Sequence, residues 1–134
     1  MTKAESLRQE LTDSGIVILD CPDMERLSVV SPDGYIGISK LENSALEHSV
    51  LAHDRWHLRL GAFYKVCSPF CIREQMEYRV KKRALMETVP PDTLCTMLAS
   101  GDDLAEIAEE LEVPQEDVLQ AFLLYKDLGL LPAC

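Results

Sequence analysis

The stretch "VLAHDRWHLRLGAFY", Val50–Tyr64, decides the expected fold of this chain. It places His53 and His57 four residues apart, with Asp54 directly after the first histidine. Side chains at positions i and i+4 of an α-helix stand one above the other on the same face. Two imidazoles in that arrangement can coordinate one zinc ion, and a carboxylate beside the first of them can act as a general base. A histidine on an apolar helix face is also commonly a hydrogen-bonded core residue, so the pair alone is a weak signal.

The flanking residues predict a helix that turns the histidines toward the interior. Ser44 and Glu47 have the spacing of a capping box, which predicts the start of the helix. Gly61 is expected to end it. Between these limits, one helical stripe is formed by Leu46, Val50, His53, His57 and Leu60.

The residues before this helix predict a small sheet. Residues 2–13 have the apolar spacing of a short amphipathic helix. "GIVILDCP", residues 15–22, is a β-branched run between a glycine and a proline, which predicts a buried strand. "LSVVSPDGYIGIS", residues 27–39, predicts a hairpin that turns at Pro32 and Gly34. Three antiparallel or mixed strands are expected.

The residues after the helix predict further helices. Residues 71–87 carry the stripe Ile72, Met76, Val80 and Ala84 on a helical pattern, which "VPP" ends. Two or three short helices are then expected within residues 92–129. The fold class is therefore α+β: a three-stranded sheet packed against the histidine helix and the helix over 71–87, with a C-terminal helical cap at about 91–134 of a single domain, residues 1–134.

Composition and charge exclude several classes of protein. The chain has 134 residues, of which 47% are apolar, as in one globular domain with its own core. No apolar run reaches the roughly 18 residues of a membrane span, and the first residues do not have the pattern of a signal peptide, so a cytoplasmic protein is expected. The net charge of −10 argues against nucleic acid as a partner. Basic residues nevertheless concentrate at 53–83, with eight basic and three acidic side chains.

The five cysteines are expected to be reduced thiols rather than a disulfide framework, because their number is odd and no export signal is present. Cys67 and Cys71, in "CSPFC", can be interpreted as two metal thiolates. Their spacing is one residue longer than that of the common zinc-knuckle pair, and no second pair follows. The alternative interpretation is two small side chains that flank a Ser-Pro turn.

"LAHDRWHLRLGAFY", followed by "SPF" and "MEYRVKKRA", resembles the ImmA/IrrE family of bacterial metallopeptidases. The resemblance covers nearly the whole chain and is strongest over residues 51–84. It implies that His53, His57 and Glu77 bind Zn²⁺, that a fourth position stays open for water, and that Asp54 is the catalytic base. Members of the family are associated with mobile genetic elements and cleave or regulate helix-turn-helix repressors, so the implied partner is a repressor protein. On the residues alone, the favoured interpretation of Glu77 is a solvated side chain that pairs with Arg73 or Lys81.

Three positions differ from the family's usual pattern. Asp54 stands where a glutamate is usual, so its carboxylate is drawn back by one methylene, roughly 1.5 Å, and a misplacement of about 1 Å can cost a hundredfold in rate. Trp56 replaces a glycine, and its bulk is expected either to narrow the cleft or to pack as an ordinary aromatic. Lys81 replaces an acidic residue, so a carboxylate that orients a metal ligand has to come from elsewhere. Tyr64 and Tyr78, each close in sequence to a ligand, are candidate oxyanion donors.

The tail from Gly101 onward carries nine acidic residues and one lysine, so a DNA-reading helix pair is not expected there. A packing role is expected instead for its apolar face, which consists of Leu104, Ile107, Ala108, Leu111, Val118, Phe122 and Tyr125.

The expected function is that of a zinc-dependent endopeptidase that cleaves a repressor. Two alternatives are a domain of the same fold that binds metal or a partner without cleavage, and an acidic interaction module without metal.

Overall fold

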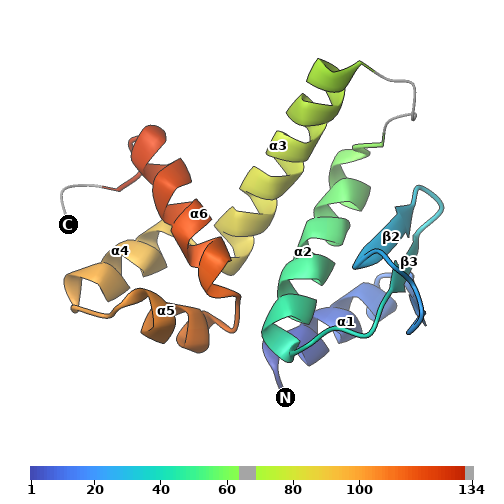
Figure 1. Cartoon of the computed structure of the whole chain (residues 1–134), viewed down its shortest axis with the longest axis horizontal. Helices are drawn as coiled ribbons and strands as arrows, with labels where there is room; N and C mark the ends of the chain where they lie inside the picture. The colour runs from blue at the N-terminus through green and yellow to red at the C-terminus, as the bar shows by residue number, and fades with distance from the viewer. Residues whose placement is uncertain (64–68, 132–134) are drawn as a thin grey trace.

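The helix that carries both histidines, α2 (Ser44–Leu60), lies at the centre of the fold, between a small sheet and helix α3 (Phe70–Thr88) (Figure 1). The computed structural model describes residues 1–63 and 69–131. The other elements are α1 (Lys3–Asp13), β1 (Val17–Asp20), β2 (Ser28–Ser31), β3 (Tyr35–Ile38), α4 (Pro91–Ala99), α5 (Leu104–Leu111) and α6 (Gln115–Asp127). This element order confirms the predicted α+β class and the C-terminal helical cap.

The sheet is mixed, with the strand order β1-β3-β2. β2 and β3 pair antiparallel and form the predicted hairpin, and Gly34 takes the positive φ of 94° that its turn requires. β1 pairs parallel with β3, with Val17 opposite Tyr35. The prediction of β1 as a buried strand was wrong. It is an edge strand, and Val17 and Leu19 on its outer face are exposed because only the other face of the sheet is covered by helices.

The start of α2 also differs from the expectation. Its N-cap is Asn43, whose side-chain oxygen accepts a hydrogen bond of 2.9 Å from the amide of Leu46. Ser44 is the first helical residue, so it does not form the predicted capping box with Glu47. The Glu47 carboxylate instead accepts hydrogen bonds from the guanidinium of Arg8, with the shorter at 2.6 Å, and this ties α2 to α1.

One core joins α1, the sheet and α2. Its buried members are Leu7, Leu11, Ile36, Ile38, Val50, Leu51, Ala52 and Ala84. Ala84 is contributed by α3, which packs along α2 on the side away from the sheet (Figure 1). Only the second half of the predicted α3 stripe is buried: Val80 and Ala84 are inside, while Ile72 is 41% exposed. The first turns of α3 therefore extend beyond the core.

A second core holds the C-terminal helices against the end of α3. It contains Leu85, Val89, Leu94, Ile107, Ala108, Leu111, Val113, Val118, Ala121 and Tyr125. The hydroxyl of Tyr125 donates a hydrogen bond of 2.6 Å to the carbonyl of Val89. The predicted packing role of the tail is confirmed for Leu111, which is buried, and for Phe122, which packs against this core. Leu104, assigned to the same face, is 38% exposed.

We expect Leu111→Ala to lower the free energy of unfolding by about 2–5 kcal/mol, because it leaves a cavity in the second core. Leu104→Ala is the matched control on the same helix and should change the value by less than about 0.5 kcal/mol, as for a surface site. Urea titration followed by circular dichroism measures both. Equal effects of the two substitutions would contradict the assignment of Leu111 to the core.

Among the described residues, no helix combines the length and the apolar character that a bilayer crossing requires.

Candidate metal centre

Three side chains from two helices converge beside the middle of α2. His53 and His57 of α2 bring their Nε2 atoms to 3.2 Å from each other. The two carboxylate oxygens of Glu77, on α3, each lie 3.3 Å from one of these nitrogens: Oε2 from His53 and Oε1 from His57. All three donor atoms lie within 4.8 Å of one another. The group can hold a metal ion, and among the described residues no other cluster of histidine, cysteine and carboxylate side chains has this arrangement.

The packing of α3 on α2 creates this convergence. Spacing along α2 already aligns His53 with His57, but Glu77 meets them only because the two helices lie side by side (Figure 1). The His57 side chain is 10% exposed, whereas those of His53 and Glu77 are 35% and 40% exposed. The centre is therefore closed on the His57 side and accessible to solvent on the other.

The end of α2 fixes the orientation of His57. Gly61 adopts a left-handed conformation at φ 60° and turns the chain back, so that the amide of Ala62 donates to the carbonyl of His57 at 3.0 Å. The carbonyl of Ala62 then lies 2.8 Å from Nδ1 of His57. Because a carbonyl can only accept, Nδ1 carries a proton, and Nε2 is the ring nitrogen that faces the centre.

The environment of His53 favours its neutral form. Burial lowers the pKa of His53, and the neighbouring His57 and Lys81 lower it further, while the carboxylate of Glu77 acts in the opposite direction. A neutral imidazole is the form that binds a metal ion. Both histidines are thus prepared as nitrogen ligands and Glu77 as an oxygen ligand.

Asp54 is buried on the side of α2 that faces β2. Burial raises its pKa to about 6, although a hydrogen bond from the Ser28 hydroxyl and the charge of His57 lower it. Its Oδ2 atom has no hydrogen-bond partner among the described residues. The charges of His57 and Glu77 both act on this carboxyl, so it lies in the electrostatic field of the centre. A buried carboxylate with one unengaged oxygen is suited to accept a proton.

Trp56 packs between the two helices. Its Nε1 donates a hydrogen bond of 3.2 Å to Glu87, near the end of α3, and Arg59 stacks over its ring at 5.1 Å. Glu87 also forms an ion pair with Arg55. Of the two roles considered for Trp56, the structure shows that of a packing aromatic: the indole lies between α2 and α3 and contacts both.

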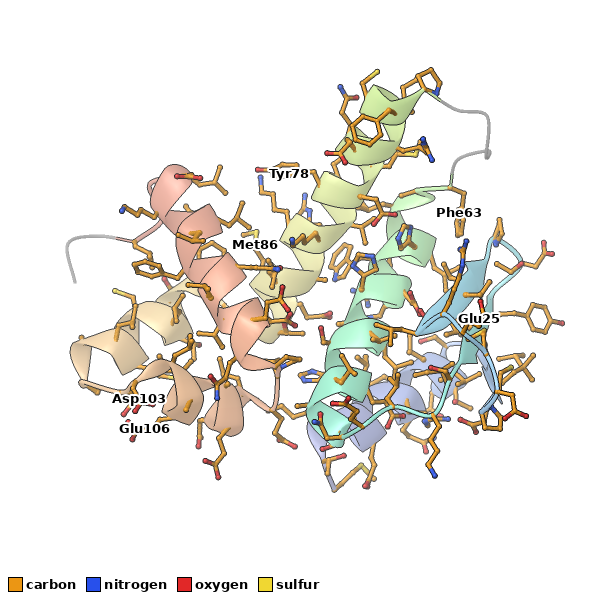
Figure 2. The ribbon with its side chains drawn as sticks, viewed as in Figure 1. Glu25, Phe63, Tyr78, Met86, Asp103 and Glu106 are labelled. Atoms are coloured by element: carbon orange, nitrogen blue, oxygen red, sulfur yellow. The ribbon has the colours of Figure 1, made fainter. Side chains whose placement is uncertain are left out.

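The structure describes only one of the two candidate oxyanion donors. Tyr64 lies outside the described residues, as does Cys67 of the "CSPFC" pair. Tyr78 is half-exposed and lies on the side of α3 that faces α6, whereas Phe63 lies at the end of α2 (Figure 2). The ring of Phe63 lies 6.2 Å from that of His57. Cys71 is an exposed free thiol.

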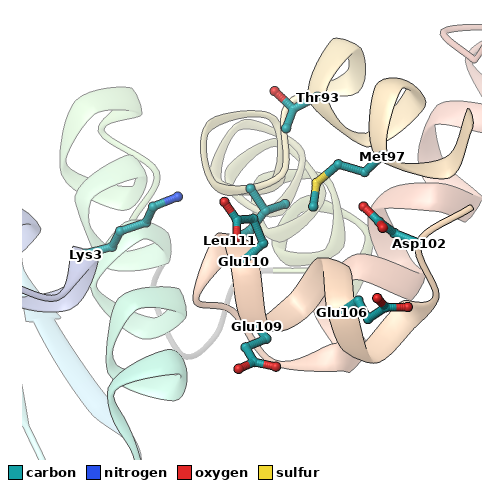
Figure 3. Close-up of a pocket in the computed structure, with 8 residues that line it drawn as sticks. All are labelled: Lys3, Thr93, Met97, Asp102, Glu106, Glu109, Glu110 and Leu111. Atoms are coloured by element: carbon teal, nitrogen blue, oxygen red, sulfur yellow. The ribbon is translucent and has the colours of Figure 1, made fainter. Parts of the chain in front are cut away.

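A separate, acidic cavity lies between the start of α1 and helices α4 and α5. Its volume is about 610 Å³, and Figure 3 shows Lys3 across it from the acidic side chains of Asp102, Glu106 and Glu110. None of the residues that line it belongs to the metal centre. Glu106 also completes the capping box of α5 with Asp103. We interpret this cavity as part of the solvated acidic surface of the tail.

We expect Gly61→Val to weaken metal binding about tenfold, because loss of the left-handed cap moves the Ala62 carbonyl that orients His57. The left-handed conformation should also cost roughly 1–2 kcal/mol of stability in a residue with a side chain. Gly101→Val is the matched control, since Gly101 has φ 84° in the tail, away from the centre. It should lower stability alone. Zinc titration and thermal melting separate the two effects, and equal zinc affinities would contradict the role of the cap.

Comparison with known protein families, curated proteins and solved structures gives no match to this chain.

Proposed function

We propose that this chain is a zinc-dependent endopeptidase of the ImmA/IrrE type that cleaves a helix-turn-helix repressor of a phage or mobile element. The observation that carries the proposal is the convergence of His53, His57 and Glu77 next to a buried carboxylate, Asp54. Two imidazoles and one carboxylate are a ligand set of catalytic zinc sites, in which the fourth position remains available to water or substrate.

The donor types support zinc as the metal. Two imidazole nitrogens and a carboxylate oxygen, all within 4.8 Å of one another, can approach one ion. Zinc accepts nitrogen and oxygen ligands at about 2.0–2.2 Å. Calcium and magnesium prefer oxygen ligands, and two imidazoles disfavour both.

The chain's own residues account for the proton transfers. When bound, zinc supplies a Lewis acid that polarises the scissile carbonyl and lowers the pKa of water. The unengaged Oδ2 of Asp54 accepts the proton of the attacking water and delivers it to the leaving amine. Ser28 holds the other part of the carboxyl group through its hydrogen bond, which limits rotation of the side chain. Glu77 and both histidines hold the metal and take no proton.

A specific observation favours a second function, a domain of the same fold that binds metal without cleaving a peptide. Asp54 is 3% exposed and is hydrogen-bonded to Ser28 of β2, which draws a short side chain toward the sheet. In this alternative the carboxylate does not reach the attacking water, and the chain acts on its partner by binding alone.

The test is incubation of the zinc-loaded protein with the purified repressor encoded beside its gene. We expect one or a few discrete fragments, and we expect a chelator to prevent their appearance. Added zinc should restore cleavage after the chelator is removed. An intact repressor that still forms a stable complex with the zinc-loaded protein would support the non-cleaving alternative instead.

A further inference from the structure

We propose that the groove between α3 and α6 binds an extended segment of the peptide substrate, in which a large apolar side chain is flanked by acidic residues. This inference rests on the proposed peptidase function and specifies which substrate segments the centre accepts.

The groove begins beside the metal centre. A cavity of about 250 Å³ lies beside His53 and is closed by α6 through Asp117 and Gln120. A second cavity of about 200 Å³ follows it along α3. Both are lined by Lys81, Leu85 and Gln120, so the two cavities are direct neighbours along α3. A peptide held at the centre can extend along this path.

The far cavity is suited to an apolar side chain. Its walls are formed mainly by Leu85, Leu123, Leu124 and the ring of Tyr78. Leu123 is 50% and Tyr78 51% exposed, so burial of a ligand side chain against them removes apolar surface from water. The volume is several times the roughly 30 Å³ of a water molecule, enough for a side chain of the size of leucine or phenylalanine.

The charge at the groove selects acidic neighbours for that side chain. Lys81 and Lys82 line the far cavity, and no acidic residue does. Within residues 1–63 and 69–131, neither lysine forms a salt bridge. The groove thus presents two ammonium groups in a chain with a net charge of −10, and Lys81 also acts electrostatically on Asp117 in the near cavity. Opposite charge on the peptide complements them and discriminates against basic segments.

The near cavity sets where the acidic residues lie. Asp117 lines it and accepts a hydrogen bond of 2.5 Å from the hydroxyl of Ser49. A second carboxylate placed there would be repelled. The acidic residues of the peptide therefore lie further along, next to Lys82, while the peptide backbone passes Asp117 and Gln120.

The experiment measures binding without turnover, with the zinc-loaded full chain that carries Asp54→Asn. The probes are short fluorescein-labelled peptides of glycine and serine with one leucine between two glutamates, or between two lysines, and a third with serine in place of the leucine. Fluorescence anisotropy gives each dissociation constant. We expect the leucine–glutamate peptide to bind about tenfold more tightly than either of the others.

Matched variants locate this preference in the groove. Lys81→Glu combined with Lys82→Glu should reverse the preference between glutamate and lysine peptides, while Arg79→Glu, an exposed residue of α3 outside the groove, should leave it unchanged. Leu123→Ser should weaken binding of the leucine peptides about tenfold, and Leu119→Ser, exposed on the same helix, should not. Zinc content is measured for every variant, so that only loaded proteins are compared.

Equal binding of the three peptides, or an equal effect of Arg79→Glu and the double lysine variant, would overturn the inference. Cleavage of the repressor together with equal peptide binding would reject the proposed role of the groove and support the proposed peptidase function. Selective peptide binding without any cleavage would support the proposed role of the groove and reject the proposed peptidase function. The two proposals are thus separated by different readouts.

Discussion

Replacing Asp54 with asparagine is expected to lower the rate of repressor cleavage by about 100- to 10,000-fold, the contribution typical of a general base. Asparagine has nearly the same volume and can still accept the hydrogen bond from Ser28, so the buried site should keep its packing. Zinc affinity should change little, because Asp54 is not among the three residues that converge. Single-turnover cleavage and zinc titration on the same preparations measure the two quantities. Asp54→Ala should give the same pattern of lost cleavage and retained zinc.

Asp54→Glu separates the proposed enzyme from the non-cleaving alternative. The added methylene extends the carboxylate by roughly 1.5 Å, and a shift of about 1 Å can change a rate a hundredfold. If Asp54 already serves as the base, wild type should cleave measurably and the glutamate variant should cleave more slowly, because the longer side chain displaces a carboxylate that is already in place. An inactive wild type beside an active glutamate variant would contradict the peptidase and favour the alternative.

Substitution of a metal-ligand residue should have the largest effect on zinc affinity. We expect His57→Ala and Glu77→Gln each to weaken zinc binding by more than about 100-fold, which exceeds the 10- to 100-fold effect of residues that only orient a ligand. His57 is the most buried of the three, and Glu77 contributes the one negative charge. Competition with a zinc-sensitive dye measures these affinities.

The matched control for Glu77 is Glu74→Gln, one turn earlier on α3 and exposed. It removes the same charge from the same helix without touching the centre, so zinc affinity should be unchanged. Full zinc occupancy in a variant that lacks both His53 and His57 would show that zinc binds somewhere other than this centre.

Local periodicity was enough to predict much of the fold. The hairpin at Gly34, the end of α2 at Gly61 and the order of the later helices follow from turn residues and from apolar spacing within each segment. The burial of β1 was predicted wrongly because a β-branched run has the same pattern on an uncovered edge strand as inside a sheet. The cap of α2 was placed one residue late because Asn43 and Ser44 are both good N-caps, and Glu47 is engaged by Arg8 instead.

The candidate centre was predictable only in part from the residues themselves. His53 and His57 share a face because of their spacing, whereas the approach of Glu77 depends on how α3 packs and was inferred from the resemblance. The Ala62 carbonyl was missed because a backbone acceptor leaves no trace in residue type, although Gly61 just before it signals that the chain turns back. Ser28 was missed because its hydrogen bond to Asp54 joins segments far apart in the sequence.

The groove between α3 and α6 could not be predicted from the sequence. From the sequence, Lys81 was noted as a departure from an acidic residue and as a possible partner of Glu77, not as part of a groove. Its place next to Leu123 and Gln120 depends on the docking of α6 against α3, and this docking is set by the second core rather than by any local pattern.

X-ray absorption spectroscopy at the zinc edge of the zinc-loaded wild-type protein tests most directly whether His53, His57 and Glu77 hold the metal. We expect nitrogen and oxygen neighbours alone, at about 2.0–2.2 Å, with the outer-shell scattering of two imidazole rings. That scattering should fall to that of one imidazole ring in His57→Ala. Sulfur neighbours at about 2.3 Å would contradict this result, because they would assign the metal to cysteine thiolates such as those of Cys67 and Cys71.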